Sequence, residues 1–267
     1  MLNREYRKEL LRKYSRSPED DALLARMLDK YELWQRDGRM QYTRFLTERD
    51  RLCCVPVLRE LGADEAFFWG GYDEAERTAL ILPARWQDAE SLKRSEESPV
   101  AVIRALWKSG ADLSHRDFLG ALMGLGIERE MIGDILVKPG NCDILLLREI
   151  VPYVQQNLSS AGRETLTLTL EDEPEVGEAK FRIIKDTVAT LRLDAIVGSG
   201  FALSREKAAG AIRSGKVSLN GLECLKPDRP VEAGSRISLR GLGKIRLSEI
   251  GGLSKKGRTI IVIERYR

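Results

Sequence analysis

The residues best suited to chemistry in this chain are cations around two short helical segments between positions 192 and 221. Apolar residues recur at helical spacing after Ser204, so a helix is predicted there with the Ser204 hydroxyl capping its N-terminus. Basic residues between the apolar ones are predicted to face outward: Arg205, Lys207, Arg213 and Lys216. Guanidinium and ammonium groups gathered on one helix are typical of a surface that binds phosphates.

A turn and a hairpin are predicted after this helix. Gly215 follows the last apolar position, where a residue with positive φ commonly ends a helix. Residues 217–219 and 222–225 read as two strands joined by Asn220-Gly221. The Asn220 amide is a candidate contact for a 2′-hydroxyl or a base edge.

This stretch resembles the S4 RNA-binding domain, here of the αL type. The domain's pattern is R-L-D, then S-R, then a basic residue before V-x-V-N-G. Positions matching in order and spacing are Arg192, Asp194, Ser204, Arg205, Lys216, Val217, Asn220 and Gly221. The domain usually has Gly-Asp before a final strand, whereas this chain has Gly234-Ser235. The resemblance implies that residues 181–267 bind RNA, with Asp194 pairing with a cation or capping a helix.

Other polar and basic residues of the same region join the candidate RNA-binding set, and several are expected to share one face. The alternative is a solvated basic surface without a ligand. The full set is Lys185, Arg192, Ser204, Arg205, Lys207, Arg213, Lys216, Asn220, Lys226, Arg240, Lys244 and Arg246. Lys255 and Lys256 belong to the same cationic region.

Three longer motifs extend the resemblance to the YlmH family of bacterial S4-domain proteins. They are FFWGGYDEAER at 67–77, HRDFLGALMGLGIEREMIGDILV at 115–137 and RGLGKIRLSEIGG at 240–252. This resemblance implies structured rRNA and tRNA on the large ribosomal subunit as partners. It also implies a role in ribosome-associated quality control of stalled translation.

Charge is distributed unevenly over the 267 residues, whose formal net charge is +3. Residues 181–267 hold 18 Lys and Arg against 8 Asp and Glu, and residues 1–180 hold 26 against 33. The length suggests about two domains. A basic C-terminal part is the electrostatic signature of nucleic-acid binding.

The fold class is predicted as α+β with three parts and a linker. Residues 1–62 are expected to be helical, with one helix starting at Ser17-Pro18 and another at 47–61 interrupted near Pro56. Residues 63–172 are expected to form a ferredoxin-like, RRM-like βαββαβ domain, and acidic residues 173–180 a linker. Strands are predicted at 78–82, 100–106, 132–137, 142–147 and 165–170, and helices at 114–125 and 149–160.

The central domain is not expected to stack bases as an RRM does. Its candidate third strand, CDILLL, has no aromatic residue, and the first contributes only Trp107. The HRD triplet at 115–117 lacks the other kinase motifs, and the single histidine and scattered cysteines indicate no metal site or disulfide framework. We therefore expect no catalytic residue, cofactor, metal or small-molecule substrate.

The N-terminus lacks a secretory apolar segment and no apolar run is long enough to span a membrane, so a cytoplasmic protein without a membrane partner is expected. Two other functions remain open. One is an RNA-modifying enzyme directed by its S4 module. The other is a protein-interaction scaffold in ribosome assembly or cell division.

Overall fold

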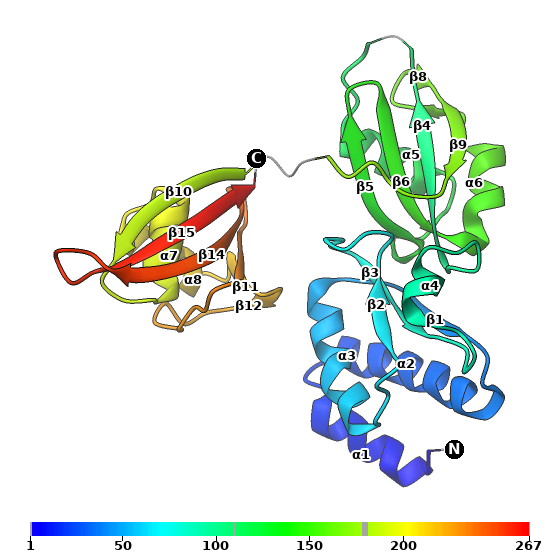
Figure 1. Cartoon of the computed structure of the whole chain (residues 1–267), viewed down its shortest axis with the longest axis horizontal. Coiled ribbons are helices and arrows are strands. Elements are labelled where there is room, and N and C mark those ends of the chain that lie inside the picture. The colour runs from blue at the N-terminus through cyan, green and yellow to red at the C-terminus, as the bar shows by residue number, and fades with distance from the viewer. Residues whose placement is uncertain (1, 109, 178–180, 267) are drawn as a thin grey trace. The chain divides into compact units, whose positions relative to one another are not determined.

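The computed structural model describes residues 2–108, 110–177 and 181–266. These form two compact units, Met1–Gly177 and Glu178–Arg267, which are considered separately (Figure 1). Of the predicted linker at 173–180, residues 178–180 lie outside the described residues. Within the described part of the chain, no helix combines the length and apolar character needed to cross a membrane.

The first unit begins with helices packed on a small antiparallel sheet. The helices bury Leu24, Met27 and Leu28 against Leu80 and Leu82 of the sheet. Strand order is β1-β3-β2. The elements are α1 (Arg4–Tyr14), α2 (Pro18–Asp37), β1 (Gln41–Leu46), α3 (Glu48–Glu60), β2 (Phe67–Trp69) and β3 (Thr78–Leu82).

This region differs from the prediction of a purely helical segment ending at residue 62. β1 pairs with β3, with Tyr42 opposite Ile81, so one sheet crosses the predicted boundary. The partner strand lies about 40 residues away, and a six-residue strand carries little periodic signal of its own. Pro56 does not interrupt α3, because burial of Val57 and Leu58 outweighs the one lost backbone hydrogen bond.

The second part of this unit has the predicted βαββαβ order and the ferredoxin-like strand order β5-β6-β4-β9. Helices α5 and α6 cover one face, where Phe118, Leu122 and Val154 pack on Ile103 and Ile144. The principal elements are β4 (Val100–Leu106), α5 (His115–Gly124), β5 (Ile132–Lys138), β6 (Asn141–Leu147), α6 (Val151–Asn157) and β9 (Thr167–Glu171). The short elements are α4 (Ala89–Lys93), η1 (Arg129–Met131), η2 (Arg148–Ile150), β7 (Ser160–Ala161) and β8 (Glu164–Thr165).

The two sheets of the first unit share a core. Phe45 and Ile81 of the small sheet pack against Val102, Leu145 and Leu147 of the larger one. Phe67, Trp69 and Tyr72 pack around the same cluster. The N-terminal and central parts therefore form one body.

The second unit is a six-stranded antiparallel sheet with two helices on one face (Figure 1). Strand order is β10-β15-β14-β13-β11-β12. The elements are β10 (Phe181–Val188), α7 (Leu193–Phe201), α8 (Arg205–Arg213), β11 (Val217–Leu219), β12 (Leu222–Glu223), β13 (Arg236–Leu239), β14 (Gly243–Leu253) and β15 (Thr259–Tyr266).

Candidate nucleic-acid interface

Two packed helices form the framework of the candidate interface. α7 buries Ile196 and Val197 against the six-stranded sheet, and α8 buries Ala208 and Ile212 in the same core. Because these side chains occupy the inner faces, the polar residues of α8 lie on its outer face. The cations of α8 are therefore presented on a rigid element.

The turn between α7 and α8 explains where the second helix begins. Ala202 adopts the left-handed conformation at φ 55°, and the Leu203 N–H donates to the Gly198 carbonyl at 2.9 Å. The Ser204 hydroxyl then accepts from the Lys207 N–H at 3.3 Å, so the predicted cap is confirmed. Ser204 thus has a structural role that does not depend on RNA.

Asp194 is a buried carboxylate that holds two arginines. Its oxygens accept from Nε and Nη2 of Arg192 at 3.2 and 3.1 Å, and from Nε of Arg205 at 3.3 Å. Only 4% of the Asp194 side chain is exposed, whereas 64% of Arg205 is. The expected pairing of Asp194 with a cation is confirmed. The buried Asp194 carboxylate holds Arg205 through Nε, and the terminal N–H groups of Arg205 are available to a phosphate.

Exposed groups continue from Arg205 along the outside of α8. Lys207, Gly210 and Arg213 are exposed and follow one another at intervals of three residues, which places them on one side of the helix. Lys216 follows, and its carbonyl accepts from the Arg240 N–H at 2.9 Å. The backbone therefore brings Arg240 beside Lys216.

The loop containing Lys226 lies against the start of α7. Pro227 accepts a hydrogen bond from the Asp194 N–H at 2.9 Å, and Pro230 forms a β-bridge with Arg192. Lys226 is exposed in this loop. The helix-side group of the predicted set is therefore Arg192, Ser204, Arg205, Lys207, Arg213, Lys216, Lys226 and Arg240.

The remaining predicted cations project from the opposite face of the sheet. Ile245 and Leu247 of β14 point into the core beneath the helices, so Lys244 and Arg246, which alternate with them, point to the other face. Lys185 of β10 stands opposite Val262 of β15 on that face. The structure therefore divides the predicted set between two surfaces.

Asn220 is held in the hairpin turn where it was predicted. It has φ 50°, and its Oδ1 accepts from the Arg236 N–H at 2.8 Å. The Asn220 N–H donates in turn to the Arg236 carbonyl at 2.7 Å. These bonds fix the hairpin, and an RNA contact by Asn220 stays a prediction.

Arg258 is a residue that sequence reasoning missed. It lies in the turn between β14 and β15, and it lines the same hollow as Arg205. The available signal was the basic run Lys255-Lys256-Gly257-Arg258 in a Gly-containing turn. That pattern alone could not show that the turn reaches α7 and α8.

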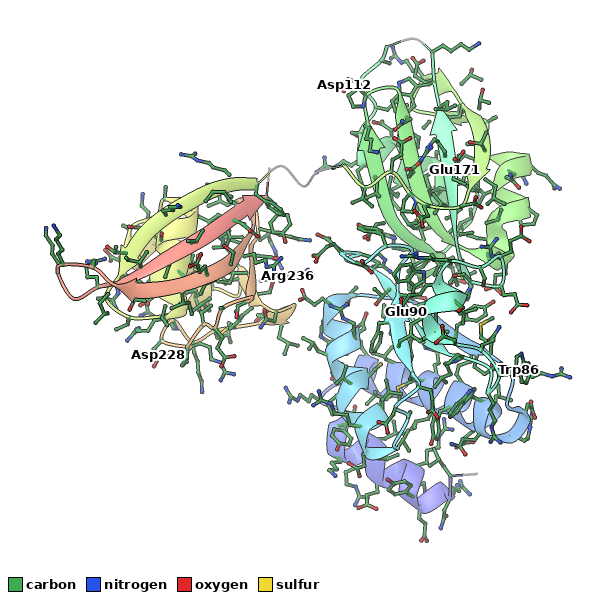
Figure 2. The ribbon with its side chains drawn as sticks, viewed as in Figure 1. Trp86, Glu90, Asp112, Glu171, Asp228 and Arg236 are labelled. Carbon is green, nitrogen blue, oxygen red and sulfur yellow. The ribbon has the colours of Figure 1, made fainter. Side chains whose placement is uncertain are left out.

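The face of the central sheet that an RRM would use is covered by the chain itself. Arg104 binds the fully buried Asp143 through two hydrogen bonds of 2.7 and 2.9 Å. The Glu175 N–H donates to Asp143 at 2.6 Å, and its carboxylate pairs with Arg104 and Lys138 at 3.0 Å each. Residues 173–177, predicted as linker, are thus bound across this face next to Glu171 (Figure 2). Trp107 lies in the core on the helix side.

Two of the longer motifs meet at one partly buried carboxylate. Asp134 accepts from the Tyr72 hydroxyl at 2.8 Å and from the N–H groups of Glu76 and Arg77 at 2.7 and 3.1 Å. Burial raises the pKa of Asp134 although these hydrogen bonds oppose the shift. The loop at 70–77 is thereby attached to β5, which gives these motifs a structural role.

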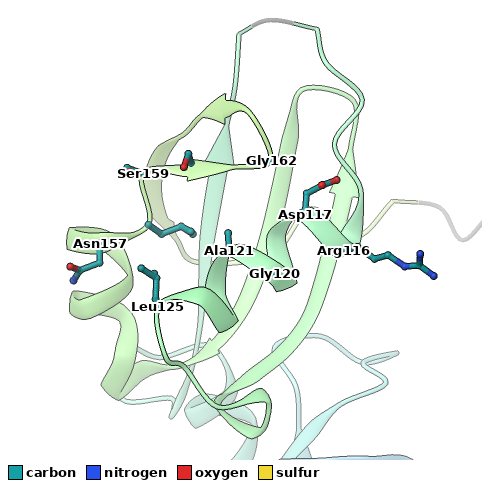
Figure 3. Close-up of a pocket in the computed structure, with 10 residues that line it drawn as sticks. Arg116, Asp117, Gly120, Ala121, Leu125, Asn157, Ser159 and Gly162 are labelled. Carbon is teal, nitrogen blue, oxygen red and sulfur yellow. The ribbon is translucent and has the colours of Figure 1, made fainter.

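A hollow of about 480 Å³ lies beside α5 and α6 (Figure 3). Asp117, a carboxylate at its rim, accepts from the Ser114 N–H and hydroxyl at 2.8 and 2.7 Å and so caps α5. Figure 3 shows Arg116 extending away from Asn157 and Ser159. Arg116 and Asp117 are the charged residues among those that line the hollow.

Comparison with known proteins finds matches to two domain families, one in each unit. Residues 107–174 match a family described as "Putative RNA-binding domain in YlmH", and residues 191–237 match the S4 domain. Ribosome-associated protein quality control protein P2 of Bacillus subtilis (strain 168) is 30% identical over 251 residues, which cover 93% of this chain and 96% of that protein. The chain belongs to the YlmH family.

A solved structure, the cell division protein ylmH from Streptococcus pneumoniae, is 18% identical with a TM-score of 0.48. The match covers 58% of this chain and 93% of that one. In this YlmH-family chain the S4 match spans α7, α8 and the strands up to β13. The prediction of the family, and of an α+β fold ending in an S4 domain, is confirmed.

Proposed function

We propose that this protein binds folded RNA through the helix-side cations of its S4 module, and that the RNA is rRNA together with tRNA on the large ribosomal subunit. The observation that carries the proposal is the presentation of Arg205, Lys207 and Arg213 on α8, with Arg205 held by Asp194. A rigid helix that presents two guanidinium groups and an ammonium group suits a folded phosphate backbone more than a flexible single strand.

The name of the Bacillus subtilis relative supports a role in ribosome-associated quality control of stalled translation. Such a role requires the protein to work in the cytoplasm. We propose that it acts there by binding RNA and not by catalysis, because the two matched families are an RNA-binding domain and the S4 domain.

The test of the interface is charge reversal on α8. The triple variant R205E/R213E/K216E is expected to abolish association with bulk tRNA and purified large subunits in a filter-binding assay, with unchanged circular dichroism. Because Arg205→Glu adds a carboxylate beside Asp194, R213E/K216E is measured as well and is expected to lose about tenfold or more in affinity.

A matched control reverses three charges on the opposite face of the sheet, K185E/K244E/R246E. We expect it to lose less affinity than the triple variant on α8. Unchanged RNA binding by both α8 variants would disprove the proposed surface.

Crosslinking to RNA in cells tests the identity of the partner. Enrichment of large-subunit rRNA with tRNA supports the proposal, and fragments without ribosomal RNA would overturn it. A changed nucleoside mass in the crosslinked RNA would instead favour the RNA-modifying enzyme. A protein partner retained after deletion of residues 178–267 would favour the scaffold.

A further inference from the structure

The turn between β14 and β15 is a basic projection on the second unit. Lys255, Lys256 and Arg258 are exposed there. The turn is closed by the Ser254 N–H donating to the Arg258 carbonyl at 2.7 Å and the Gly257 N–H donating to the Ser254 carbonyl at 2.9 Å. It is an ordered tip and not a loose loop.

Arg258 ties this tip to the end of β10. Its Nη2 donates to the Thr187 carbonyl at 2.5 Å. The guanidinium is thereby held at the rim of a hollow of about 370 Å³ that Arg205 also lines. Arg205 and Arg258, which are distant in sequence, therefore line one space, and each is held by its own hydrogen bond.

The charges around the hollow favour an anion. Asp194 lines it but is bound by both Arg192 and Arg205. Asp186 also lines it and accepts from the Ser199 hydroxyl and the Thr187 N–H, at 2.7 Å each, which are neutral donors. Two arginines and two carboxylates line the hollow itself. The excess of positive charge comes from three cations beside it, namely Arg192, which pairs with Asp194, and the two tip lysines in the same turn as Arg258. The carboxylates are Asp186 and Asp194, and the cations are Arg192, Arg205, Arg258, Lys255 and Lys256.

We propose that this hollow holds the phosphodiester backbone of the RNA that lies on α8, and that the tip lysines grip the same RNA beyond it. The inference rests on the proposed RNA-binding function and adds a second point of contact. Cations continue from the hollow in two directions, along α8 through Lys207 and along the tip through Lys256. A chain of phosphates fits that extended arrangement better than a single free anion does.

The test uses the full chain, bulk tRNA as the probe, and two variants of opposite expected sign. K255E/K256E should lower affinity about tenfold and reduce the log–log salt slope by about 1.4 to 1.8, the value for two lost phosphate contacts. D186N keeps an acceptor for Ser199 and removes a charge that repels phosphate, so it should raise affinity about threefold.

The matched control is K8E/R12E, which reverses two exposed cations on α1 and should leave affinity within about twofold. If K255E/K256E does not fold, K255Q/K256Q replaces it. The expected change in slope is the same, because Gln also loses both phosphate contacts, and the loss of affinity should be smaller because no negative charge is added. If K255E/K256E binds tRNA as tightly as the control does, and D186N binds it as tightly as the wild type does, the inference is overturned. R213E/K216E would still lose binding in that case if the proposed function holds.

Titration of inorganic phosphate distinguishes a free anion from an RNA backbone. No saturable binding is expected at millimolar concentrations. Saturable phosphate binding that K255E/K256E leaves unchanged would make the hollow a small-anion site and would overturn the proposed grip on RNA.

Discussion

Gly210 is an unexpected residue in the middle of α8, because glycine weakens a helix interior. It lies three residues after Lys207 and three before Arg213, so it occupies the cationic side of the helix. A Cβ at this position would meet nothing within 4 Å, so packing inside the protein does not require glycine. A bare backbone here would let an RNA strand approach the helix closely.

Replacing this glycine should therefore have opposite effects on folding and binding. G210A is expected to raise the free energy of unfolding by about 0.5–1 kcal/mol and to weaken tRNA binding. Urea denaturation and filter binding measure the two effects. The control is G124A at the end of α5, where a Cβ also meets nothing. It should leave RNA binding unchanged, and equal affinities for G210A and the wild type would exclude a close approach at Gly210.

Buried ionisable groups of the first unit make its stability sensitive to alkaline pH. Burial raises the pKa of the Cys54 thiol from 9.0 to about 12. It also raises the pKa values of Cys142 and Tyr72. Above about pH 9 the unfolded chain ionises these groups, whereas the folded state keeps them neutral. Ionisation therefore favours the unfolded state, and the free energy of unfolding, which is unaffected below about pH 9, falls as the pH rises.

For Cys54 alone this loss is up to about 1.4 kcal/mol per pH unit between pH 9 and 12. The C54A variant should be less stable at pH 8 because of the cavity it creates. It should also lose stability less steeply above pH 9. Urea midpoints at pH 8, 9.5 and 10.5 test this, and parallel curves for the two proteins would contradict the assignment to Cys54.

Among the elements, those with strong local patterns were predicted well. The strand at 100–106 was predicted at its observed bounds, and the helix at 114–125 differs from α5 by one residue at each end. β1 and β10 were missed, because each is defined by a distant partner. β10 pairs with β15 about 75 residues later, and its outer face mixes Ile183 with Lys185. The contacts of Glu175 in the predicted linker could not be foreseen, because composition does not reveal a buried Arg104–Asp143 pair.

That pair should determine whether residues 173–177 stay on the sheet. Asp143→Asn keeps the shape but weakens the bonds from Arg104 and from the Glu175 N–H, so it should cost about 2 kcal/mol of stability. It should also speed cleavage at Glu173 and Glu175 by a Glu-specific protease. The matched control is E171Q, whose carboxylate is 3.4 Å from Arg104 and should contribute less than about 1 kcal/mol. Equal cleavage rates for the two variants would show that Asp143 does not hold the segment.

At the scale of the whole molecule, the change from an acidic to a basic sequence falls at the same position as the boundary between the two hydrophobic cores. The basic residues concentrate after position 180, and the second unit has its own core around Ile196, Leu247 and Ile263. The candidate contacts could be named from the sequence because the S4 pattern is local. Their division between two faces could not, because it depends on the register of β13, β14 and β15.

Because core and cations belong to one unit, a fragment of residues 178–267 should fold alone and keep most of the RNA affinity. Its log–log salt slope should equal that of the full chain, with about −0.7 to −0.9 for each phosphate contacted. Residues 1–177, which are net acidic and whose central sheet face is covered by Glu175, should bind bulk tRNA at least about tenfold more weakly. Filter binding between 50 and 300 mM salt measures both fragments. If residues 1–177 reproduced the slope of the full chain, the central domain would supply the phosphate contacts, and the cations of the S4 module would be a solvated surface.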